Sequence, residues 1–346
     1  MARVTLRTIA DELGVSRMTV SNAFSRPDQL SPALRDRILE TAKRLGYAGP
    51  DPSGRALARG RTGVVGMVLT EDPRDAFRDD VAIGFTRAVT ESLADAGYSL
   101  ALLHNGAGDV IPSRDVAMDG AIVYACTPQS EAVRHLLERR LPIVRVEGLP
   151  IEGIAGVSLD DEAGSAEAAA HLVNLGHREI AIVSVGFDAD GDRITEPPST
   201  HLAIIGRRMT GWLRALTAAG IRPRVYAAPG PLIDDVLRLR IDHLLDDAPT
   251  AVLAFSDLAA LEVIERARAR GIDVPGSLSV VGFDDNPVAQ RISPRLTTVR
   301  QDLQRKGELT VAALLQQLEG GRPESPAPLP TELVIRESTA PPHRRA

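Results

Sequence analysis

The sequence of 346 residues predicts a small all-α head followed by a two-lobed α/β body, and two changes of pattern along the chain support this. Residues 5–47 carry apolar side chains at helical spacing, interrupted at Gly14 and Gly46. From residue 63 onward, short apolar runs alternate with longer amphipathic stretches, which is typical of parallel strands covered by helices on both faces. Because one sheet rarely holds so many strands, we expect two parallel sheets with a cleft where their strand ends face each other.

The charge of the chain is divided between these two parts. The net charge is −6, but residues 1–62 hold 11 Lys and Arg against 6 Asp and Glu, and the remainder holds 29 against 40. A basic head on an acidic body is expected when one small module contacts phosphate and the rest does not. Cys126 is the only cysteine, and the sequence has neither a secretory signal nor an apolar run of membrane-spanning length, so we expect a cytoplasmic protein.

Three helices are predicted in the head, with a hinge after them. Thr5 can cap the first helix and Ser16 the second, because each hydroxyl stands just before a helical apolar pattern. The third helix is predicted over 32–45. The breaker cluster GPDPSG at 49–54 forms the linker, and 55–59 can form one or two helical turns that are too short to be stable alone.

The strands of the body are predicted from its apolar runs, most of which are separated by helical stretches of ten or more residues. In chain order they cover 64–69, 99–103, 120–124, 143–146, 156–159, 179–185, 224–227, 251–255, 279–282 and 333–336.

A set of motifs runs in order from the head to the end of the chain. TLRTIADELGVSRMTVSNAFSRPDQLSPALRDRILETAKRLGY comes first, followed by PDPSGRALARGRTGVVGMVL. LVNLGHREIAIV, RRMTGW, AVLAFSD, VPGSLSVVGFDD and PRLTTVRQD then follow in the body. Together they resemble the DNA-binding head, the hinge helix and the successive core signatures of the lac repressor and purine repressor family of bacterial transcriptional regulators.

The resemblance implies a domain plan and a function. The plan is a helix-turn-helix head over 1–48, a hinge over 49–62, and a periplasmic-binding-protein-like effector and dimerisation domain over 63–346. Its N-lobe covers about 63–158 and 302–326, and its C-lobe about 159–300 and 327–340. The implied protein is a homodimeric repressor that binds palindromic operator DNA and is controlled by a sugar or nucleoside bound between the lobes. Two segments depart from the family pattern: 104–119 is short and loop-like, and 187–204 is a longer loop.

The resemblance assigns the base-reading role to Arg17, Met18 and Asn22 on the second helix. Arg suits guanine, Asn suits adenine and Met suits the thymine methyl group. Asn22 stands where the family commonly has arginine, so we expect a different operator. Leu57 matches the hinge leucine that wedges into the minor groove. The alternative for the second helix is an ordinary exposed polar helix face, and the alternative for the segment around Leu57 is a plain flexible linker. Contacts to phosphate are expected from Thr5, Ser16, Thr19 and Ser21.

The resemblance also assigns effector-cleft positions in the body. Arg208, Asp257 and Asp284 match cleft residues of the C-lobe, where a guanidinium and carboxylates suit a hydroxyl-rich ligand. Phe77 matches an aromatic residue of the N-lobe that packs against the ligand. The alternative role for Asp257 is to cap the helix that follows it. Trp212 is expected in the core.

The sequence contains no catalytic motif, with no G-x-S-x-G, no phosphate loop and no H-E-x-x-H, so we expect neither an enzyme nor a cofactor. No metal is expected either, since the acidic run at 188–192 lacks the later residues of a calcium loop. His177 is expected to be a structural hydrogen-bonding residue, and 338–346 to be disordered. The alternatives are a transporter's solute-binding protein, which the head argues against, and an enzyme on the same architecture.

Overall fold

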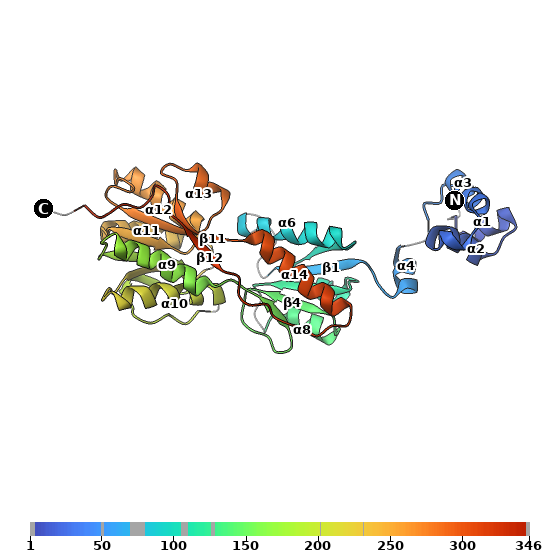
Figure 1. Ribbon diagram of the computed structural model, residues 1–346, viewed down its shortest axis with the longest axis horizontal. Helices are drawn as coiled ribbons and strands as arrows, with labels where there is room; N and C mark the ends of the chain where they lie inside the picture. Colours follow the sequence, from blue (N-terminus) through green and yellow to red (C-terminus); the bar gives the residue numbers. More distant parts are fainter. Residues whose placement is uncertain are drawn as a thin grey trace. The chain divides into compact units, whose positions relative to one another are not determined.

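Three helices and one small core make up the head (Figure 1). These are α1 (Leu6–Leu13), α2 (Arg17–Ser25) and α3 (Pro32–Arg44), with a short 3-10 turn at Pro27–Gln29. Both predicted caps are confirmed, because the Thr5 and Ser16 side chains accept the backbone N–H groups of Thr8 and Thr19. The buried core residues are Ile9, Ala10, Val20, Ala23, Ile38 and Ala42.

The computed structural model describes residues 4–49, 52–69, 80–104, 110–125, 129–200, 202–230 and 232–343. The chain forms two units, Met1–Gly63 and Val64–Ala346. The hinge helix α4 (Pro52–Arg59) belongs to the first unit. Phe77, which the sequence analysis places in the cleft, lies outside the described residues. Within the described ranges, no helix is both long and apolar enough to cross a membrane.

The N-lobe of the second unit is built on a five-stranded parallel sheet of order β2-β1-β3-β4-β5. Alternate residues of β1 enter different cores, as a strand covered on both faces requires: Met67 packs with the α6 and α14 side, and Val68 with the α8 side. The strands are β1 (Val64–Leu69), β2 (Ser99–Leu103), β3 (Gly120–Tyr124), β4 (Ile143–Val146) and β5 (Ala155–Val157), and the helices are α6 (Asp80–Asp95), α7 (Pro112–Asp115), α8 (Glu131–Glu138) and α14 (Leu303–Leu318). The four-residue α7 is the one helix in the described part of 104–119, in agreement with the loop-like sequence.

The C-lobe holds a seven-stranded sheet of order β12-β11-β10-β9-β6-β8-β7, in which the two edge strands are antiparallel to their neighbours. Its strands are β6 (Ile180–Val185), β7 (Ala189–Arg193), β8 (Arg224–Ala228), β9 (Ala251–Ala254), β10 (Ser279–Asp284), β11 (Thr297–Gln301) and β12 (Thr331–Val334). Its helices are α9 (Asp161–Asn174), α10 (Ala203–Ala218), α11 (Asp235–Asp246), α12 (Asp257–Ala269) and α13 (Pro287–Arg291). Trp212 of α10 is buried in this core, as predicted.

The structure corrects the sequence analysis in two strands. β7 lies inside 187–204, which the sequence predicts as a long loop, and it adds a polar edge strand to the sheet. An edge strand pairs on one side only, so it needs no apolar run, and charged residues there hinder pairing with other chains. β11 is missed because its buried faces are formed by threonines, including Thr297 and Thr298, rather than by a run of aliphatic residues.

The predicted disorder of the C-terminal segment is wrong for 338–343. Ser338 Oγ donates to the Val280 carbonyl oxygen at 2.6 Å and accepts the backbone N–H of Thr297 at 2.8 Å. His177 confirms its predicted structural role here, since its Nε2 lies 2.9 Å from the Ala340 carbonyl oxygen. Polar hydrogen bonds to strands, which leave no apolar pattern in the sequence, therefore fix this segment on the C-lobe.

Candidate functional site

The N-terminal end of α2 presents side chains to solvent. Arg17 and Met18 are exposed, Met18 at 69%, while Val20 and Ala23 of the same helix are buried in the head. Asn22 is half-buried, and its amide donates to Gln29 Oε1 at 3.2 Å. The helix is thus anchored by one face and offers a guanidinium and a thioether at its free end.

Two of the four hydroxyl residues predicted to contact phosphate also cap helices. Thr5 and Ser16 serve as helix caps by accepting backbone N–H groups. Ser16 Oγ also lies 2.9 Å from Thr19 Oγ1. A hydroxyl that accepts a cap bond keeps one O–H to donate, so capping and phosphate contact are compatible. Ser21 is half-buried on α2, and its backbone carbonyl accepts the Ser25 hydroxyl.

Leu57 lies exposed to solvent on the hinge helix α4. It is 87% exposed, the largest exposed fraction among the large apolar side chains of the described residues. An isolated exposed leucine is ordinary on a protein surface, but α4 is only eight residues long and is marginal as a helix without further contacts. The hinge helix α4 therefore exposes an apolar side chain, and it needs contacts with another molecule or segment to be a stable helix.

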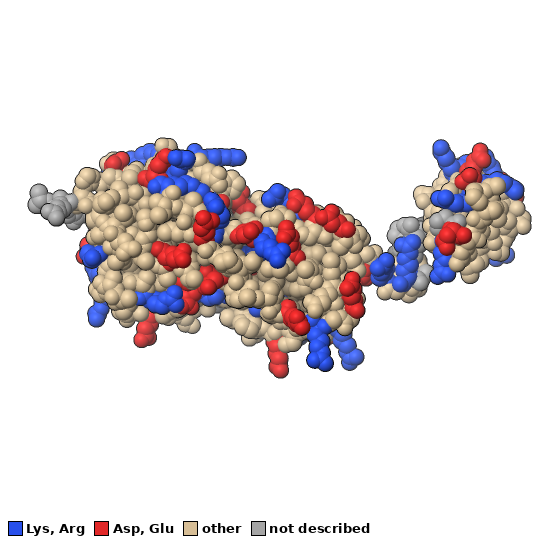
Figure 2. All heavy atoms as spheres, viewed as in Figure 1, with Lys and Arg blue, Asp and Glu red and all other residues tan. Residues whose placement is uncertain are grey.

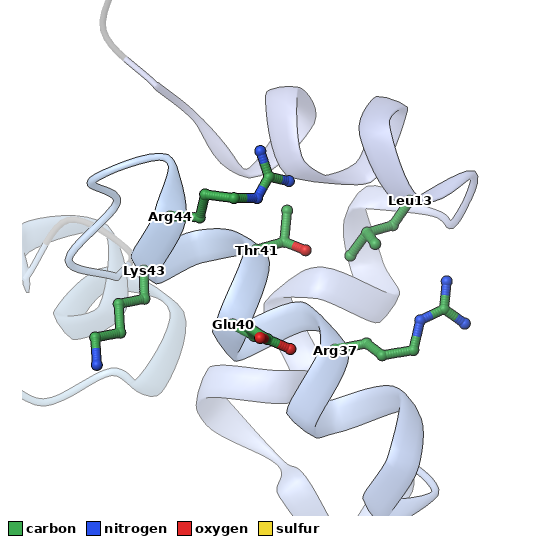
Figure 3. Close-up of a pocket in the computed structure, with 6 residues that line it drawn as sticks. All are labelled: Leu13, Arg37, Glu40, Thr41, Lys43 and Arg44. Atoms are coloured by element: carbon green, nitrogen blue, oxygen red, sulfur yellow. The ribbon is translucent and has the colours of Figure 1, made fainter.

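The surface of the head also carries a shallow hollow of about 560 Å³, lined by Leu13 of α1 and five residues of α3. Lys and Arg side chains lie on several parts of the visible face of the head, with a few acidic ones among them (Figure 2). In the close-up, the side chains of Arg37, Lys43 and Arg44 point in different directions (Figure 3). The hollow is a poor ligand site, because its polar groups do not converge on one point. Its arginine and lysine side chains add instead to the basic surface of the head.

The body contains a different kind of site, centred on the buried guanidinium of Arg208. Its Nε donates to Asp161 Oδ1 at 3.1 Å and its Nη2 to Asp284 Oδ1 at 3.3 Å. Its Nη1 donates to the Phe255 carbonyl oxygen, and its Cζ lies 3.5 Å from the centroid of the Phe283 ring. Burial alone lowers the pKa of Arg208, but the charges of Asp284 and Asp161 raise it above its usual value, so the group stays cationic.

These contacts continue into a closed ring of polar side chains that we call the interlobe ring. From Asp161 the ring passes to Arg207, whose Nη2 donates to Glu147 Oε2 of the N-lobe at 2.6 Å. Glu147 Oε1 accepts Lys306 Nζ at 3.0 Å. The ring then returns to the C-lobe, since Lys306 Nζ donates to Gln301 Oε1 at 3.1 Å and Gln301 Nε2 donates to Asp284 Oδ1 at 2.8 Å. Its seven members are Arg208, Asp161, Arg207, Glu147, Lys306, Gln301 and Asp284.

Backbone strain gathers at the same place. Ala125, Glu147, Asp284 and Asp285 have φ of +54°, +54°, +121° and +54°, values that residues with a side chain rarely adopt. Ala125 follows β3, Glu147 follows β4, and Asp284 ends β10, so all three stand at the carboxyl ends of parallel strands. Such strain persists where the surrounding structure enforces it, and it clusters at functional sites.

Asp257 lies behind this edge of the C-lobe. It is fully buried, and its carboxylate accepts the Asn286 backbone N–H at 2.8 Å and the Thr298 hydroxyl. The cap of α12 is Ser256, whose Oγ accepts the Ala259 N–H, so the alternative capping role for Asp257 is wrong. Burial raises the pKa of Asp257 to about 7 despite these two hydrogen bonds, and the charge of Asp285 adds to the rise.

The raised pKa predicts a pH-dependent stability that Asp257→Asn removes. Between pH 4 and 7 the folded protein keeps a proton on Asp257 that the unfolded chain has lost, so the free energy of unfolding falls as pH rises through this window. Asparagine resembles the protonated acid, with Nδ2 donating to the Thr298 hydroxyl and Oδ1 accepting the Asn286 N–H. We expect the variant to be more stable than wild type at pH 8, by on the order of 2–4 kcal/mol.

Urea unfolding at pH 5 and pH 8 measures this difference. Asp235→Asn is the control, because Asp235 is 98% exposed and should leave the pH dependence unchanged. A loss of stability at pH 8 in Asp257→Asn, equal to its loss at pH 5, would contradict a protonated Asp257.

Two members of the interlobe ring, Arg208 and Asp284, were predicted from the sequence, and the other five were not. Lys306 had a signal of its own, because it is the only lysine of the body. Glu147 directly follows β4 and Gln301 ends β11, so both stand at the carboxyl end of a strand, as Asp284 does. Among the described residues, no group of three or more His, Cys, Asp or Glu side chains is arranged to hold a metal ion.

Comparisons with known proteins match both parts of the chain. Residues 5–49 match the family described as bacterial regulatory proteins, lacI family, and residues 169–339 match the periplasmic binding protein-like domain. An HTH-type transcriptional regulator of Mycobacterium tuberculosis is 36% identical over 98% of both chains. The transcriptional repressor CytR of Escherichia coli is 29% identical over 97% of this chain and 96% of its own. A solved complex of the transcriptional regulator CelR with cellobiose is 28% identical, covers 97% of this chain and 100% of its own, and gives a TM-score of 0.69.

Proposed function

This chain belongs to the lacI family of bacterial regulatory proteins. We propose that it is a cytoplasmic, homodimeric repressor that binds DNA and a small molecule and catalyses no reaction. Its paired heads bind a palindromic operator, and a small molecule between the lobes changes its affinity for that operator. The observation that carries the proposal is the free end of α2, where Arg17 and Met18 stand exposed on a helix held by its buried face. This is the arrangement by which a recognition helix meets base edges in the major groove.

In the proposed complex, the DNA-contacting side chains of the head divide into two classes. Arg17, Met18 and Asn22 contact base edges, and therefore determine the sequence that is read. The hydroxyls of Thr5, Ser16, Thr19 and Ser21 contact phosphates, and therefore position the head without reading sequence. The 11 basic residues of 1–62 supply the attraction to DNA that precedes specific docking.

Arg17→Ala and Asn22→Ala are expected to weaken binding to the cognate operator by about 1–3 kcal/mol per half-site and to relax preference at one base pair each. Operator selection from a random library gives the cognate site, and binding is then measured at fixed salt on all its single-base variants. Ser21→Ala is the matched control on the same helix, expected to weaken binding equally for every variant. If Arg17→Ala and Asn22→Ala show that same uniform loss, their base-reading role is wrong.

The proposed effector is a neutral, hydroxyl-rich molecule of the sugar or nucleoside class. The formal charges of the interlobe ring cancel, with three cations against three carboxylates, so a net charge on the ligand would lack compensation in a buried site. Arg208 and Asp284 contact the ligand from the C-lobe, Asp257 holds the turn behind Asp284, and Phe77 packs against the ligand from the N-lobe. The relative CelR was solved with cellobiose, which supports a carbohydrate.

A thermal-shift screen of neutral sugars, nucleosides and sugar phosphates, with cellobiose included, tests the effector class. A ligand that binds only the folded state adds about 2.7 kcal/mol of stability at a hundredfold excess over its Kd. We expect stabilisation by neutral polyhydroxy compounds, and a change in operator binding by the same compound. If only phosphorylated compounds stabilise the protein, the charge argument is wrong.

A solute-binding protein of a transporter is the alternative that the body alone would allow. The match of residues 5–49 to a regulatory head favours the regulator, because a solute-binding protein has no use for a DNA-reading helix. The operator selection separates the two, since a solute-binding protein would enrich no sequence.

A further inference from the structure

Lys306 joins the two lobes of the body. It is buried, with 1% of its side chain exposed, on a helix that belongs to the N-lobe. The position of that helix is tightly fixed: a Cβ added at Gly307 would lie 2.5 Å from the Cβ of Ala88 on α6. Lys306 therefore moves with the N-lobe, yet its Nζ donates to Gln301 Oε1 at the end of a C-lobe strand.

A second bridge lies one step away in the interlobe ring. Arg207 of the C-lobe donates to Glu147 of the N-lobe, and Glu147 is shared with Lys306. Lys306 thereby fixes both bridges, one directly and one through Glu147. Its Nζ also lies 5.8 Å and 6.0 Å from the ring centroids of Phe85 and Tyr124, a stacked pair that forms the N-lobe wall beside it.

On these contacts we propose that Lys306 is a positioning residue of the effector site, which holds the lobes together around Arg208 and Asp284 before any effector binds. The proposal rests on the proposed function for the identity of that site, but not for the bridges themselves. Gln301 donates to Asp284, and Asp284 accepts Arg208, so the orientation of Lys306 is passed to the two groups assigned to the ligand. An effector thus meets a cleft whose polar groups are already oriented, and less ordering opposes its binding.

The chemistry of the ring explains why one substitution has a large effect. Removing one partner from a buried ion pair leaves the other charge poorly compensated. Lys306→Met keeps the apolar stem beside Phe85 and Tyr124 but removes the ammonium. It leaves Glu147 with Arg207 alone and leaves the Gln301 oxygen without its bridge to the N-lobe, so the lobes should separate more often.

Hydrogen exchange of the full chain without effector tests this proposal. In Lys306→Met, amides of segments 143–147 and 297–301 should exchange about tenfold faster than in wild type, which corresponds to about 1.4 kcal/mol less free energy for opening. Amides of β9, in the centre of the C-lobe sheet, should exchange at the wild-type rate. Arg305→Met is the matched control on the same helix, because it removes an exposed cation paired with Glu308.

Each outcome decides the proposal. Faster exchange confined to segments 143–147 and 297–301 in Lys306→Met, and absent from Arg305→Met, supports it. Unchanged exchange overturns it, and so does faster exchange that includes β9, since that pattern indicates a merely structural role. Should Lys306→Met fail to fold, Arg207→Gln breaks the other bridge at a side chain that is 29% exposed and should give the same local pattern. No effector takes part, so a failed ligand screen leaves this result intact.

Discussion

Arg208→Ala is expected to abolish the response of operator binding to the effector while operator binding itself is retained. The substitution removes donors to Asp161, Asp284 and the Phe255 carbonyl oxygen in one step. Breaking a buried ion pair by removing one partner costs about 3–5 kcal/mol, and here two carboxylates lose the same cation. That cost falls on the stability of the body, because the ion pairs are broken in the free protein as well. The hydrogen bonds that Arg208 would have made to the ligand are also lost, which lowers effector affinity by about 1–3 kcal/mol, or about 5- to 150-fold. The head belongs to a separate compact unit of the chain, so its DNA contacts should persist.

The measurement is a titration of the best ligand from the screen into wild type and variant, followed on the protein and on its operator complex. Arg214→Ala is the control, because Arg214 lies on the same helix but pairs with Glu162 at the surface. Arg208→Lys covers the case in which alanine destabilises the body, since lysine keeps the charge but cannot reproduce the fork of a guanidinium. Equal effector affinity in Arg208→Ala and Arg214→Ala would refute the assigned cleft.

The sequence predicted the elements whose signals are local. The caps at Thr5 and Ser16 follow from hydroxyls placed before apolar helical spacing, and most strands follow from aliphatic runs. β11, in which Val299 is the one apolar residue, and the segment from Ser338 onward escaped because much of what fixes them is hydrogen bonding by hydroxyl groups. Such bonds depend on the position of a partner distant in sequence, and no periodicity reveals that partner.

The residues of the candidate site were also predictable only where a local motif marked them, and not where a contact joins residues distant in sequence. Arg208 and Asp284 stand in motifs that resemble a known family, and both lie in the interlobe ring. Lys306 and Glu147 are 159 residues apart, and their contact exists only because α14 returns to the N-lobe after the chain has formed β6 to β11 of the C-lobe sheet. A pairing of this kind follows from topology, so the residue types alone give no indication of it.

Leu57→Ala is expected to weaken specific operator binding and to reduce the bend in the bound DNA. Leu57 is 87% exposed in the free protein, so its contribution to DNA binding comes from burial that occurs only in the complex. Burying one leucine side chain is worth about 1.5–3 kcal/mol relative to leaving it exposed, and a homodimer buries two. Part of that energy is used to unstack a base step, which kinks the duplex.

The bend is measured by gel-shift phasing on the selected operator, and affinity by titration at fixed salt. Leu57→Met is the matched control, since methionine keeps an apolar side chain of similar volume and should retain most of the bend. Effector binding should be unchanged in both variants, because the cleft belongs to the other unit of the chain. The head also keeps its fold, since Leu57 contributes nothing to the core formed by α1, α2 and α3. If Leu57→Ala weakens binding but leaves the bend at its wild-type value, the leucine acts by contact alone and the wedge is wrong.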